Sequence, residues 1–224
     1  VFGRLYSFLK RERITIVEAH VWYACIVGRV VARAAGVPIV ITNEQDMRTG
    51  EDAHRRDVVY TGDVTTRLSS ACVHITHALQ SSFVEGTPRI LQGNVIRRII
   101  PNGIDAERVA SIVAATSRNE KRAALGIPED AFVVGNVARL HPAKGLPYLL
   151  TAFAEVLRSV PNAHLVLVGW GVMEGELRAQ ASALGVTERV HFAGKRLDVF
   201  ELLATFDVFA FSSVHEGQGI AILE

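Results

Sequence analysis

The sequence predicts an α/β protein with two doubly wound, Rossmann-like domains. Short apolar runs alternate with amphipathic helical stretches along the 224 residues, so helices bound the strands on both sides. This alternation is typical of βαβ units and of parallel sheets covered on both faces. It is interrupted at 106–128 by a charged, alanine-rich stretch and then begins again. The 49% apolar content is sufficient for one large core or two modest ones.

Residues 1–105 are expected to form the first domain. Their strands are predicted where short runs rich in Val and Ile are bounded by turn residues or polar residues. The predicted strands are 14–17, 38–42, 71–75 and 95–100, and the helices are a segment before 14, 22–35, 58–70 and a short one after 75. Gly36 is expected to end the helix at 22–35, and 101–105, Pro-Asn-Gly-Ile-Asp, is a turn by composition.

Residues 106–224 are expected to form the second domain, beginning with a helical connector at 106–128. The same criteria predict the strands 131–137, 163–168, 190–192 and 208–211, and the helices 146–159, 174–184 and 199–204. A further helix begins near 219, but at this length it is not stable by itself. The chain also opens on valine. We therefore expect an internal piece of a longer protein, with both domains incomplete and little activity alone.

Composition excludes several classes of protein. The formal net charge of +1 does not favour nucleic acid as a partner. The two cysteines, Cys25 and Cys72, lie in apolar contexts without metal-ligand spacing, which favours buried free thiols over a disulfide. The sequence has no apolar run of the roughly 18–20 residues needed for a membrane span and no signal-peptide pattern. These features predict a cytoplasmic location.

The C-terminal motif is the most informative part of the sequence. An apolar strand leads into a loop with Gly217 and Gly219, and a helix then begins. Glycine lets a ligand approach the backbone closely, and exposed N–H groups at a helix start favour an anion. Glu216 and Glu224 flank this turn and are suited to accept hydrogen bonds from hydroxyl groups. Phosphate and hydroxyl groups together indicate a sugar nucleotide.

Two further loops follow predicted strands, where ligands bind in open parallel sheets. Arg139 and Lys144 follow the strand 131–137 and are suited to bind two phosphates, although a solvated loop with incidental charge is the alternative. Gly169 and Gly171 follow the strand 163–168 and would admit a flat base or a ribose, although a plain glycine-rich turn is equally common.

Four segments, in this order, resemble the retaining glycosyltransferases of the two-Rossmann-domain (GT-B) architecture, especially family 4, the glycosyl transferases group 1. They are Ile-Pro-Asn-Gly-Ile-Asp at 100–105, Ala-Arg-Leu at 138–140 with Lys-Gly at 144–145, Leu-Val-Gly-Trp-Gly at 167–171, and the pair Glu216 and Glu224. The resemblance spans nearly the whole chain. It implies two domains that face each other across a cleft, where a nucleoside-diphosphate sugar gives its sugar to an acceptor. Residues 1–105 would form the acceptor-side domain and residues 106–224 the donor-binding domain.

The resemblance also implies a role for each matching residue. Arg139 and Lys144 would hold the diphosphate, Glu216 the hydroxyls of the donor sugar, and Glu224 the ribose. The backbone N–H groups of Gly217, Gln218 and Gly219 would contact the sugar and phosphate. No cofactor or metal is implied, and the sequence contains no Asp-x-Asp. The acceptor would be a sugar, a lipid-linked hydroxyl or another hydroxyl, and peripheral membrane contact through a missing N-terminal part is an option.

The expected chemistry agrees with these roles. Breaking the anomeric C–O bond builds negative charge on the leaving phosphate, so a cation pair there stabilises the transition state more than the ground state. Family enzymes retain the anomeric configuration, commonly explained by front-face attack in which the leaving phosphate accepts the acceptor's proton. The alternative is that Glu216 acts as a covalent nucleophile, as in retaining hydrolases.

The first half departs from the family pattern at two points. Glu18 stands in place of the first histidine of a His-x-His pair, of which His20 is the second. Glu44 occupies a position where a histidine near the donor sugar is usual, although a carboxylate there would repel a diphosphate. We expect His20 and Glu44 to be candidate cleft residues, with structural loop roles as the alternative.

Other functions remain open at this stage. A GT-B epimerase or a sugar phosphorylase would share the architecture, and a non-catalytic sugar-nucleotide-binding subunit is suggested by Glu44. A nicotinamide dehydrogenase is the weakest option, because no Gly-x-Gly-x-x-Gly opens either half. The residues do not identify the nucleotide base, the sugar or the acceptor.

Overall fold

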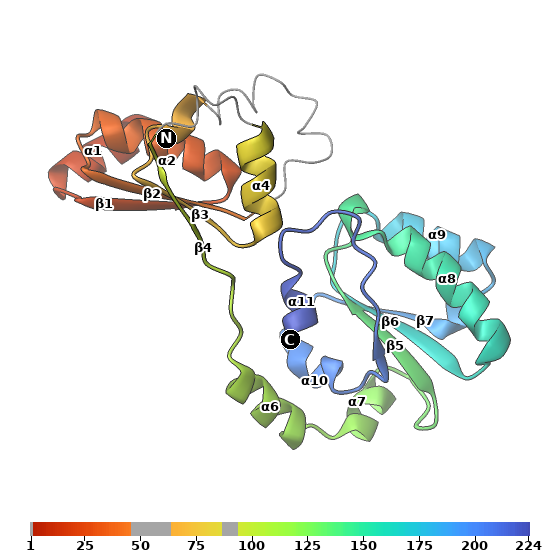
Figure 1. Cartoon of the computed structure of the whole chain (residues 1–224). Helices are drawn as coiled ribbons and strands as arrows, with labels where there is room; N and C mark the ends of the chain where they lie inside the picture. Colours follow the sequence, from red (N-terminus) through yellow and green to blue (C-terminus); the bar gives the residue numbers. More distant parts are fainter. Residues whose placement is uncertain (1, 46–63, 87–93) are drawn as a thin grey trace. The chain divides into compact units, whose positions relative to one another are not determined.

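The computed structural model describes residues 2–45, 64–86 and 94–224 (Figure 1). The chain divides into two compact units. Unit 1 comprises Val1–Asn102 with Glu216–Gln218, and unit 2 comprises Gly103–His215 with Gly219–Glu224. Each unit contains a four-stranded sheet whose neighbouring strands are all parallel. The predicted α/β class with parallel sheets is therefore confirmed.

In unit 1 the strands pair in the order in which they occur in the chain. They are β1 (Ile16–His20), β2 (Ile39–Glu44), β3 (Ala71–His74) and β4 (Ile96–Ile99), and the helices are α1 (Phe2–Arg11), α2 (Trp22–Ala34) and α4 (His77–Gly86). Of the predicted helix 58–70, residues 64–66 form a helical turn, and the part before 64 lies outside the described residues.

The core of unit 1 lies between α2 and the strands β1 and β2. Val31 and Ala32 of α2 pack with Val40 of β2 in one buried cluster. Gly28 allows this close packing, because a Cβ at that position would lie 2.9 Å from the Cβ of Ala19. The strand β2 ends at Glu44, two residues later than predicted. This later end places the side chain of Glu44 within the sheet and not in a loop.

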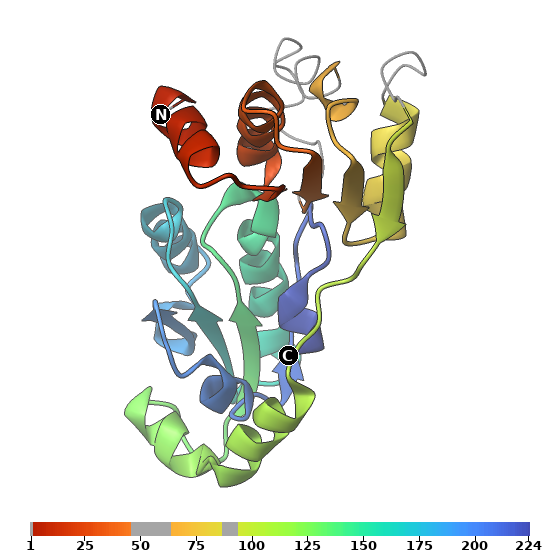
Figure 2. The ribbon, with the colours of Figure 1, turned by 90° about the vertical axis from the view of Figure 1, so that its left-hand side faces the viewer.

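Unit 2 carries the strands β5 (Phe132–Val137), β6 (Ala163–Val168), β7 (Val190–Gly194) and β8 (Val208–Phe209), ordered β7-β6-β5-β8 (Figure 2). Its helices are α6 (Ala106–Ala115), α7 (Arg118–Ala124), α8 (Leu146–Ser159), α9 (Glu174–Ala183), α10 (Val199–Leu203) and α11 (Ile220–Leu223). The predicted bounds of α8 and β6 are confirmed residue by residue. The strand β8 is shorter than predicted and ends at Phe209. Just beyond it, the side-chain amide of Asn136 donates a hydrogen bond to the carbonyl of Ala210.

Every residue of β6 is buried, because the sheet of unit 2 is covered on both faces. Leu165 and Leu167 join a cluster with the helices α8 and α9, whereas Val166 and Val168 join a second cluster with Leu202 of α10. These alternating contacts, together with the reversal of strand order at β5, make unit 2 doubly wound. The reversal places the carboxyl ends of β5 and β8 side by side.

Candidate functional site

The candidate site lies at the carboxyl ends of β5 and β8 in unit 2. In open α/β sheets, ligands bind where the strand order reverses. The loop after β5 carries Arg139 and Lys144, and the loop after β8 begins at 210. The structure therefore brings the two predicted phosphate-binding cations to the reversal point of the sheet.

Backbone hydrogen bonds hold the loop after β5 against the loop after β6. The N–H of Ala138 donates to the carbonyl of Val168 and that of Leu140 to the carbonyl of Trp170, both at 3.0 Å. The side chain of Leu140 is 1% exposed and anchors the loop in the core. Arg139 lies between these two anchored residues and is exposed, so its position is fixed while its guanidinium faces solvent.

The loop after β8 is tied to the same segment. The N–H groups of Val214 and His215 donate to the carbonyl of Ala143 at 2.9 and 3.2 Å, and the hydroxyl of Ser212 donates to the carbonyl of Lys144 at 2.9 Å. The short 3-10 turn Pro142–Lys144 is capped by the ring of His141. Both sides of the reversal point are thereby held together around Lys144.

Glycine follows Lys144 for a steric reason. Gly145 has a φ of 61°, in the left-handed region. A Cβ there would lie 2.1 Å from the carbonyl oxygen of Ser212. The Lys-Gly pair therefore lets the loops after β5 and β8 approach each other.

Gly169 and Gly171 also have a structural role. A Cβ on Gly169 would lie 1.9 Å from the carbonyl oxygen of Ala138, and one on Gly171 would lie 2.3 Å from that of Leu140. Gly169 also has a φ of 141°. Packing of backbone on backbone accounts for both glycines, and their contact with a base or ribose stays a prediction.

The remaining residues of the C-terminal motif are divided between the units. Glu216, Gly217 and Gln218 belong to unit 1, whereas Gly219 and Glu224 belong to unit 2. Gln218 exchanges two hydrogen bonds with the backbone of Asn102, at 2.7 and 2.9 Å. A Cβ on Gly217 would lie 2.2 Å from the carbonyl oxygen of Gln45. Gly219 is left-handed, with a φ of 64°, and precedes the four-residue helix α11, after which Glu224 follows.

Glu44 is not exposed at the site, and the prediction of a cleft role is corrected. Its side chain is 2% exposed and accepts a hydrogen bond from Arg29 of α2 at 2.5 Å. Arg29 also donates to Ser69 at 3.0 Å and to Thr42 at 3.1 Å. Because β2 continues to Glu44, alternate residues from Val40 onward face α2. The signal in the sequence was an arginine inside the apolar stripe of α2.

His20 is exposed at the carboxyl end of β1, as a cleft candidate should be. Its Nε2 lies 3.2 Å from a carboxylate oxygen of Glu18, and its Nδ1 lies 3.5 Å from the amide nitrogen of Gln45. Val21, the next residue, has a φ of 60° and a ψ of 155°. A β-branched residue rarely adopts this conformation. The backbone strain therefore lies directly beside His20.

Both cysteines are free and buried, as predicted. Burial and the neighbouring Glu44 carboxylate raise the pKa of Cys25 to about 12. Its thiol donates to the carbonyl of Ala19 at 3.2 Å. Cys25 is therefore a structural thiol in the core of unit 1.

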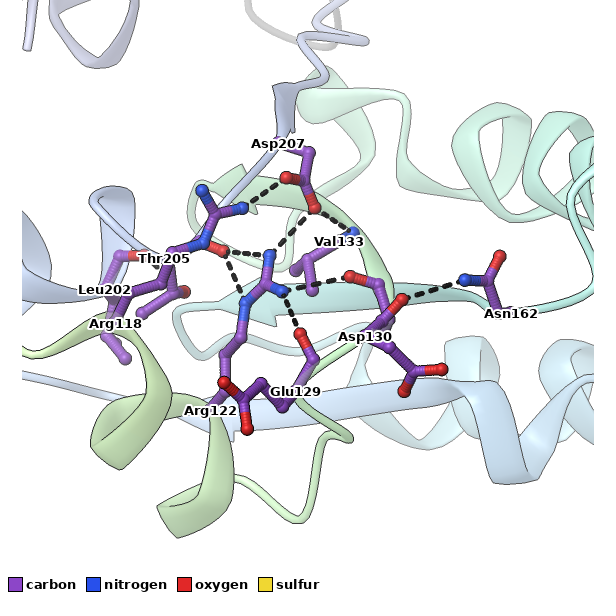
Figure 3. Close-up of polar contacts among 10 residues, drawn as sticks. Arg118, Arg122, Glu129, Asp130, Val133, Asn162, Leu202, Thr205 and Asp207 are labelled. Carbon is purple, nitrogen blue, oxygen red and sulfur yellow. Dashed lines mark hydrogen bonds and ion pairs between the residues drawn. The ribbon is translucent and has the colours of Figure 1, made fainter.

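A cavity of about 510 Å³ lies at the opposite, amino-terminal edge of the unit 2 sheet, and the sequence did not predict it. Polar residues that line this cavity hydrogen-bond one another (Figure 3). Arg122 of α7 is 4% exposed and donates to the carbonyls of Glu129, Ala131 and Thr205. It also donates to the carboxylate of Asp207 at 2.8 Å, which in turn accepts from the N–H of Val133 at 2.7 Å. This network joins α7 to the starts of β5 and β8.

Asp207 also accepts a hydrogen bond from Arg118. Desolvation raises the pKa of this carboxyl, but the hydrogen bonds from Val133, Arg118 and Arg122 outweigh it and keep the pKa below its usual value. The cavity is thus lined by groups that bind one another. We interpret it as a structural anchor and not as the substrate site.

Within 2–45, 64–86 and 94–224, no cluster of three or more His, Cys, Asp or Glu has a geometry that could hold a metal ion. None of the helices in these ranges has the length and apolar character to cross a membrane.

Comparisons with known proteins identify a family and a shared fold. Residues 117–224 match the family model "Glycosyl transferases group 1". The chain is 30% identical over 234 residues to the UDP-Gal:alpha-D-GlcNAc-diphosphoundecaprenol alpha-1,3-galactosyltransferase of Escherichia coli, covering 98% of this chain and 57% of that protein. It is 35% identical over 127 residues to a GDP-mannose-dependent alpha-(1-6)-phosphatidylinositol monomannoside mannosyltransferase of Mycolicibacterium smegmatis, covering 55% and 32%.

Solved structures show the same fold. Anabaena HepE, in complex with UDP and glucose, superposes with a TM-score of 0.81 at 24% identity, covering 99% of this chain and 59% of that one. Sucrose-phosphate synthase from Thermosynechococcus elongatus gives a TM-score of 0.80 at 16% identity, covering 98% and 55%. The chain thus spans 57% of the length of the Escherichia coli relative, and 59% and 55% of the lengths of these two structures.

Proposed function

Because the chain belongs, through residues 117–224, to the glycosyl transferases group 1 family, we propose that its protein transfers a hexosyl group from a nucleoside-diphosphate sugar to an acceptor hydroxyl. The observation that carries this proposal is the position of Arg139 and Lys144. Both lie on a loop that hydrogen bonds hold at the strand-order reversal of unit 2, where a parallel α/β sheet binds its ligand.

We propose a UDP-hexose as the donor. The Escherichia coli relative uses UDP-galactose by name and aligns with 98% of this chain. HepE, which shares the fold, was crystallised with UDP and glucose. The GDP-mannose-dependent relative aligns with only 55% of the chain, so the longer alignment favours uridine.

In the proposed reaction Arg139 and Lys144 stabilise the charge that develops on the departing diphosphate. Glu216 binds hydroxyls of the donor sugar, Glu224 binds the ribose, and the N–H groups of 217–219 contact the sugar and phosphate. The acceptor hydroxyl attacks from the face that the phosphate leaves, and a phosphate oxygen takes its proton, so the anomeric configuration is retained. We propose that the cation pair serves in place of a divalent metal.

A lipid-linked sugar is the acceptor class that we propose. The names of both transferase relatives include lipid acceptors, a diphosphoundecaprenol sugar and a phosphatidylinositol mannoside. Such acceptors would require peripheral contact with a membrane, and we propose that this contact is with its cytoplasmic face.

Alanine at Arg139 or at Lys144 tests the proposal in the natural polypeptide. We expect each change to lower kcat by roughly 10²- to 10³-fold, the usual effect of removing one group that stabilises developing negative charge. Hexose transfer from radiolabelled UDP-hexose to a lipid-linked acceptor is the measurement. Arg158→Ala on α8, whose side chain is 76% exposed, is the control. Wild-type rates in both variants would overturn the diphosphate role of this loop.

The same assay tests metal independence, retention of the anomeric configuration and the type of reaction. Transfer is expected to continue in a metal chelator, and NMR of the product should show the anomeric configuration of the donor. Release of a sugar phosphate or formation of an epimerised nucleotide sugar would identify a phosphorylase or an epimerase instead. The alternative of a non-catalytic binding subunit rested on a carboxylate, Glu44, at the donor site. Glu44 is instead paired with Arg29 inside unit 1, so this alternative has no supporting observation.

A further inference from the structure

We propose that Trp170 is the platform on which the donor's nucleotide base stacks, with Lys195 as the cation beside it. This inference rests on the proposed function and adds the binding place of the base. Trp170 is 59% exposed although it follows a fully buried strand. An exposed indole at the ligand-binding edge of a parallel sheet is a large apolar surface that a base can cover.

Hydrogen bonds place Trp170 between the loop of Arg139 and the loop of Lys195. The carbonyl of Trp170 accepts from the N–H of Leu140 at 3.0 Å, one residue after Arg139. On its other side, the N–H of Gly169 donates to the carbonyl of Gly194 at 2.9 Å, one residue before Lys195. The ammonium of Lys195 lies over the indole, 6.0 Å from the ring centroid.

The spacing of the strands fits an extended nucleoside diphosphate. Neighbouring strands are about 4.8 Å apart, so the loops after β5 and β7 are separated by about 10 Å across β6. A nucleotide with its diphosphate at Arg139 and Lys144 would extend its ribose and base along this edge, over Trp170. The apolar side chains of Val172 and Leu197, 88% and 98% exposed, border the same edge and extend the surface for a base.

The indole can bind a base before any specific hydrogen bond forms. Every nucleobase has a π-face, so stacking on an aromatic side chain is favourable for all of them. The Lys195 contact is a loose cation–π pair at an exposed site, which costs little to displace. Trp170 therefore contributes affinity for any nucleoside. Preference for one base would come from hydrogen bonds between the protein and the edge of that base.

The test is calorimetric titration of the natural polypeptide with UDP, GDP and inorganic diphosphate. Trp170→Ala should weaken UDP and GDP binding about 5- to 100-fold, the usual range for loss of one base–aromatic stack. Diphosphate binding should change less than about twofold, and Trp170→Phe should keep most of the UDP affinity. Phe8→Ala, which removes an exposed aromatic from α1 of unit 1, is the matched control.

A fluorescence titration gives a second readout. Trp22 and Trp170 are the two tryptophans of this sequence, so the emission of Trp170 is measured as the difference between a Trp22→Phe variant and a Trp22→Phe/Trp170→Phe variant. UDP should quench this emission and inorganic diphosphate should not. Unchanged UDP affinity in folded Trp170→Ala would overturn the base platform and leave the phosphate site intact. If wild type bound neither UDP nor diphosphate, the proposed function itself would fail.

Discussion

Glu44 and Arg29 are almost completely removed from water, at 2% and 1% exposure. A buried carboxylate is tolerated when a cation and hydrogen bonds compensate the loss of its hydration. Arg29 supplies that charge, and its guanidinium is held by Ser69 and Thr42. The carboxylate that stands in place of the family's histidine is therefore part of the core of unit 1 and presents no charge to a diphosphate.

We expect Glu44→Ala to lower the free energy of unfolding by about 3–5 kcal/mol, because it leaves the Arg29 charge buried without this partner. The double variant Arg29→Met/Glu44→Met should recover most of that loss, since an apolar pair of similar volume removes both charges. Urea denaturation measures both effects. Glu85→Ala, at an exposed position of α4, is the control. A cost below about 1 kcal/mol for Glu44→Ala would contradict the buried-pair interpretation.

At the scale of elements, the loops after β5, β6 and β8 are packed backbone on backbone. Gly145 and Gly169 each combine a positive φ with a site where a Cβ would lie about 2 Å from a neighbouring carbonyl oxygen. Such glycines are required by the fold whether or not a ligand touches them. They allow Arg139 and Lys144, the proposed diphosphate-binding residues, to lie on one edge of the sheet.

Gly169→Ala should destabilise unit 2 by about 2–4 kcal/mol, because a left-handed residue and an overlap with Ala138 both cost free energy. Gly175→Ala is a matched control within the same unit: it lies in α9, with nothing within 4 Å of its Cβ. That change should raise stability by up to about 1 kcal/mol. Thermal unfolding monitored by circular dichroism compares the two. If both variants shifted the unfolding temperature equally, close packing would not be the reason for glycine at 169.

At the scale of the whole molecule, the two edges of the unit 2 sheet differ in chemistry. The carboxyl edge exposes Trp170 and the loop of Arg139. At the amino edge, polar groups bind one another, as in the network of Arg122 and Asp207. There His164 and His191, at the starts of β6 and β7, have ring nitrogens 2.8 Å apart, and Arg189 lies 2.9 Å from the other ring nitrogen of His164.

This histidine pair predicts a loss of stability in mild acid. Desolvation, with His191 and Arg189 nearby, lowers the pKa of His164 from 6.5 to about 4 against a weaker opposing effect of Asp130. Desolvation also lowers the pKa of His191, opposed by its bond to the backbone of Leu125. Below pH 6.5 the unfolded chain therefore binds protons that the folded one does not, and stability falls as the pH drops toward 4.

We expect Tm to decrease between pH 6.5 and 4 by at least about 2–4 °C, the equivalent of roughly 1 kcal/mol for a chain of this size. Scanning calorimetry across this range measures it. His164→Gln keeps a donor and an acceptor but does not titrate, so its Tm should depend less on pH. The carboxyls of Asp198 and Asp207 have pKa values lowered from 3.8, so their contribution is lost only at lower pH. If the Tm of His164→Gln fell with pH as steeply as that of the wild type, the role of His164 would be refuted.

The order of strands and helices could be predicted from the sequence because it depends on local patterns. Alternation of apolar runs and helical stretches is visible within a window of some ten residues, and the bounds of α8 and β6 followed from it. The loop of Arg139 and Lys144 could also be placed, because such loops follow parallel strands at the ligand-binding edge. The family resemblance used the same short segments.

Tertiary structure alone decided what the side chains meet. Glu44 faces Arg29 for two reasons. The strand β2 extends two residues beyond its predicted end, and the helix α2, which begins 22 positions before Glu44, carries Arg29. The closed network of Arg122 and Asp207 joins residues 85 positions apart, and the glycines at 169 and 171 are explained by carbonyls of another loop. A sequence pattern reports the periodicity of one segment. Burial, charge pairing and close approach belong to pairs of segments, so they appear only when the chain is folded.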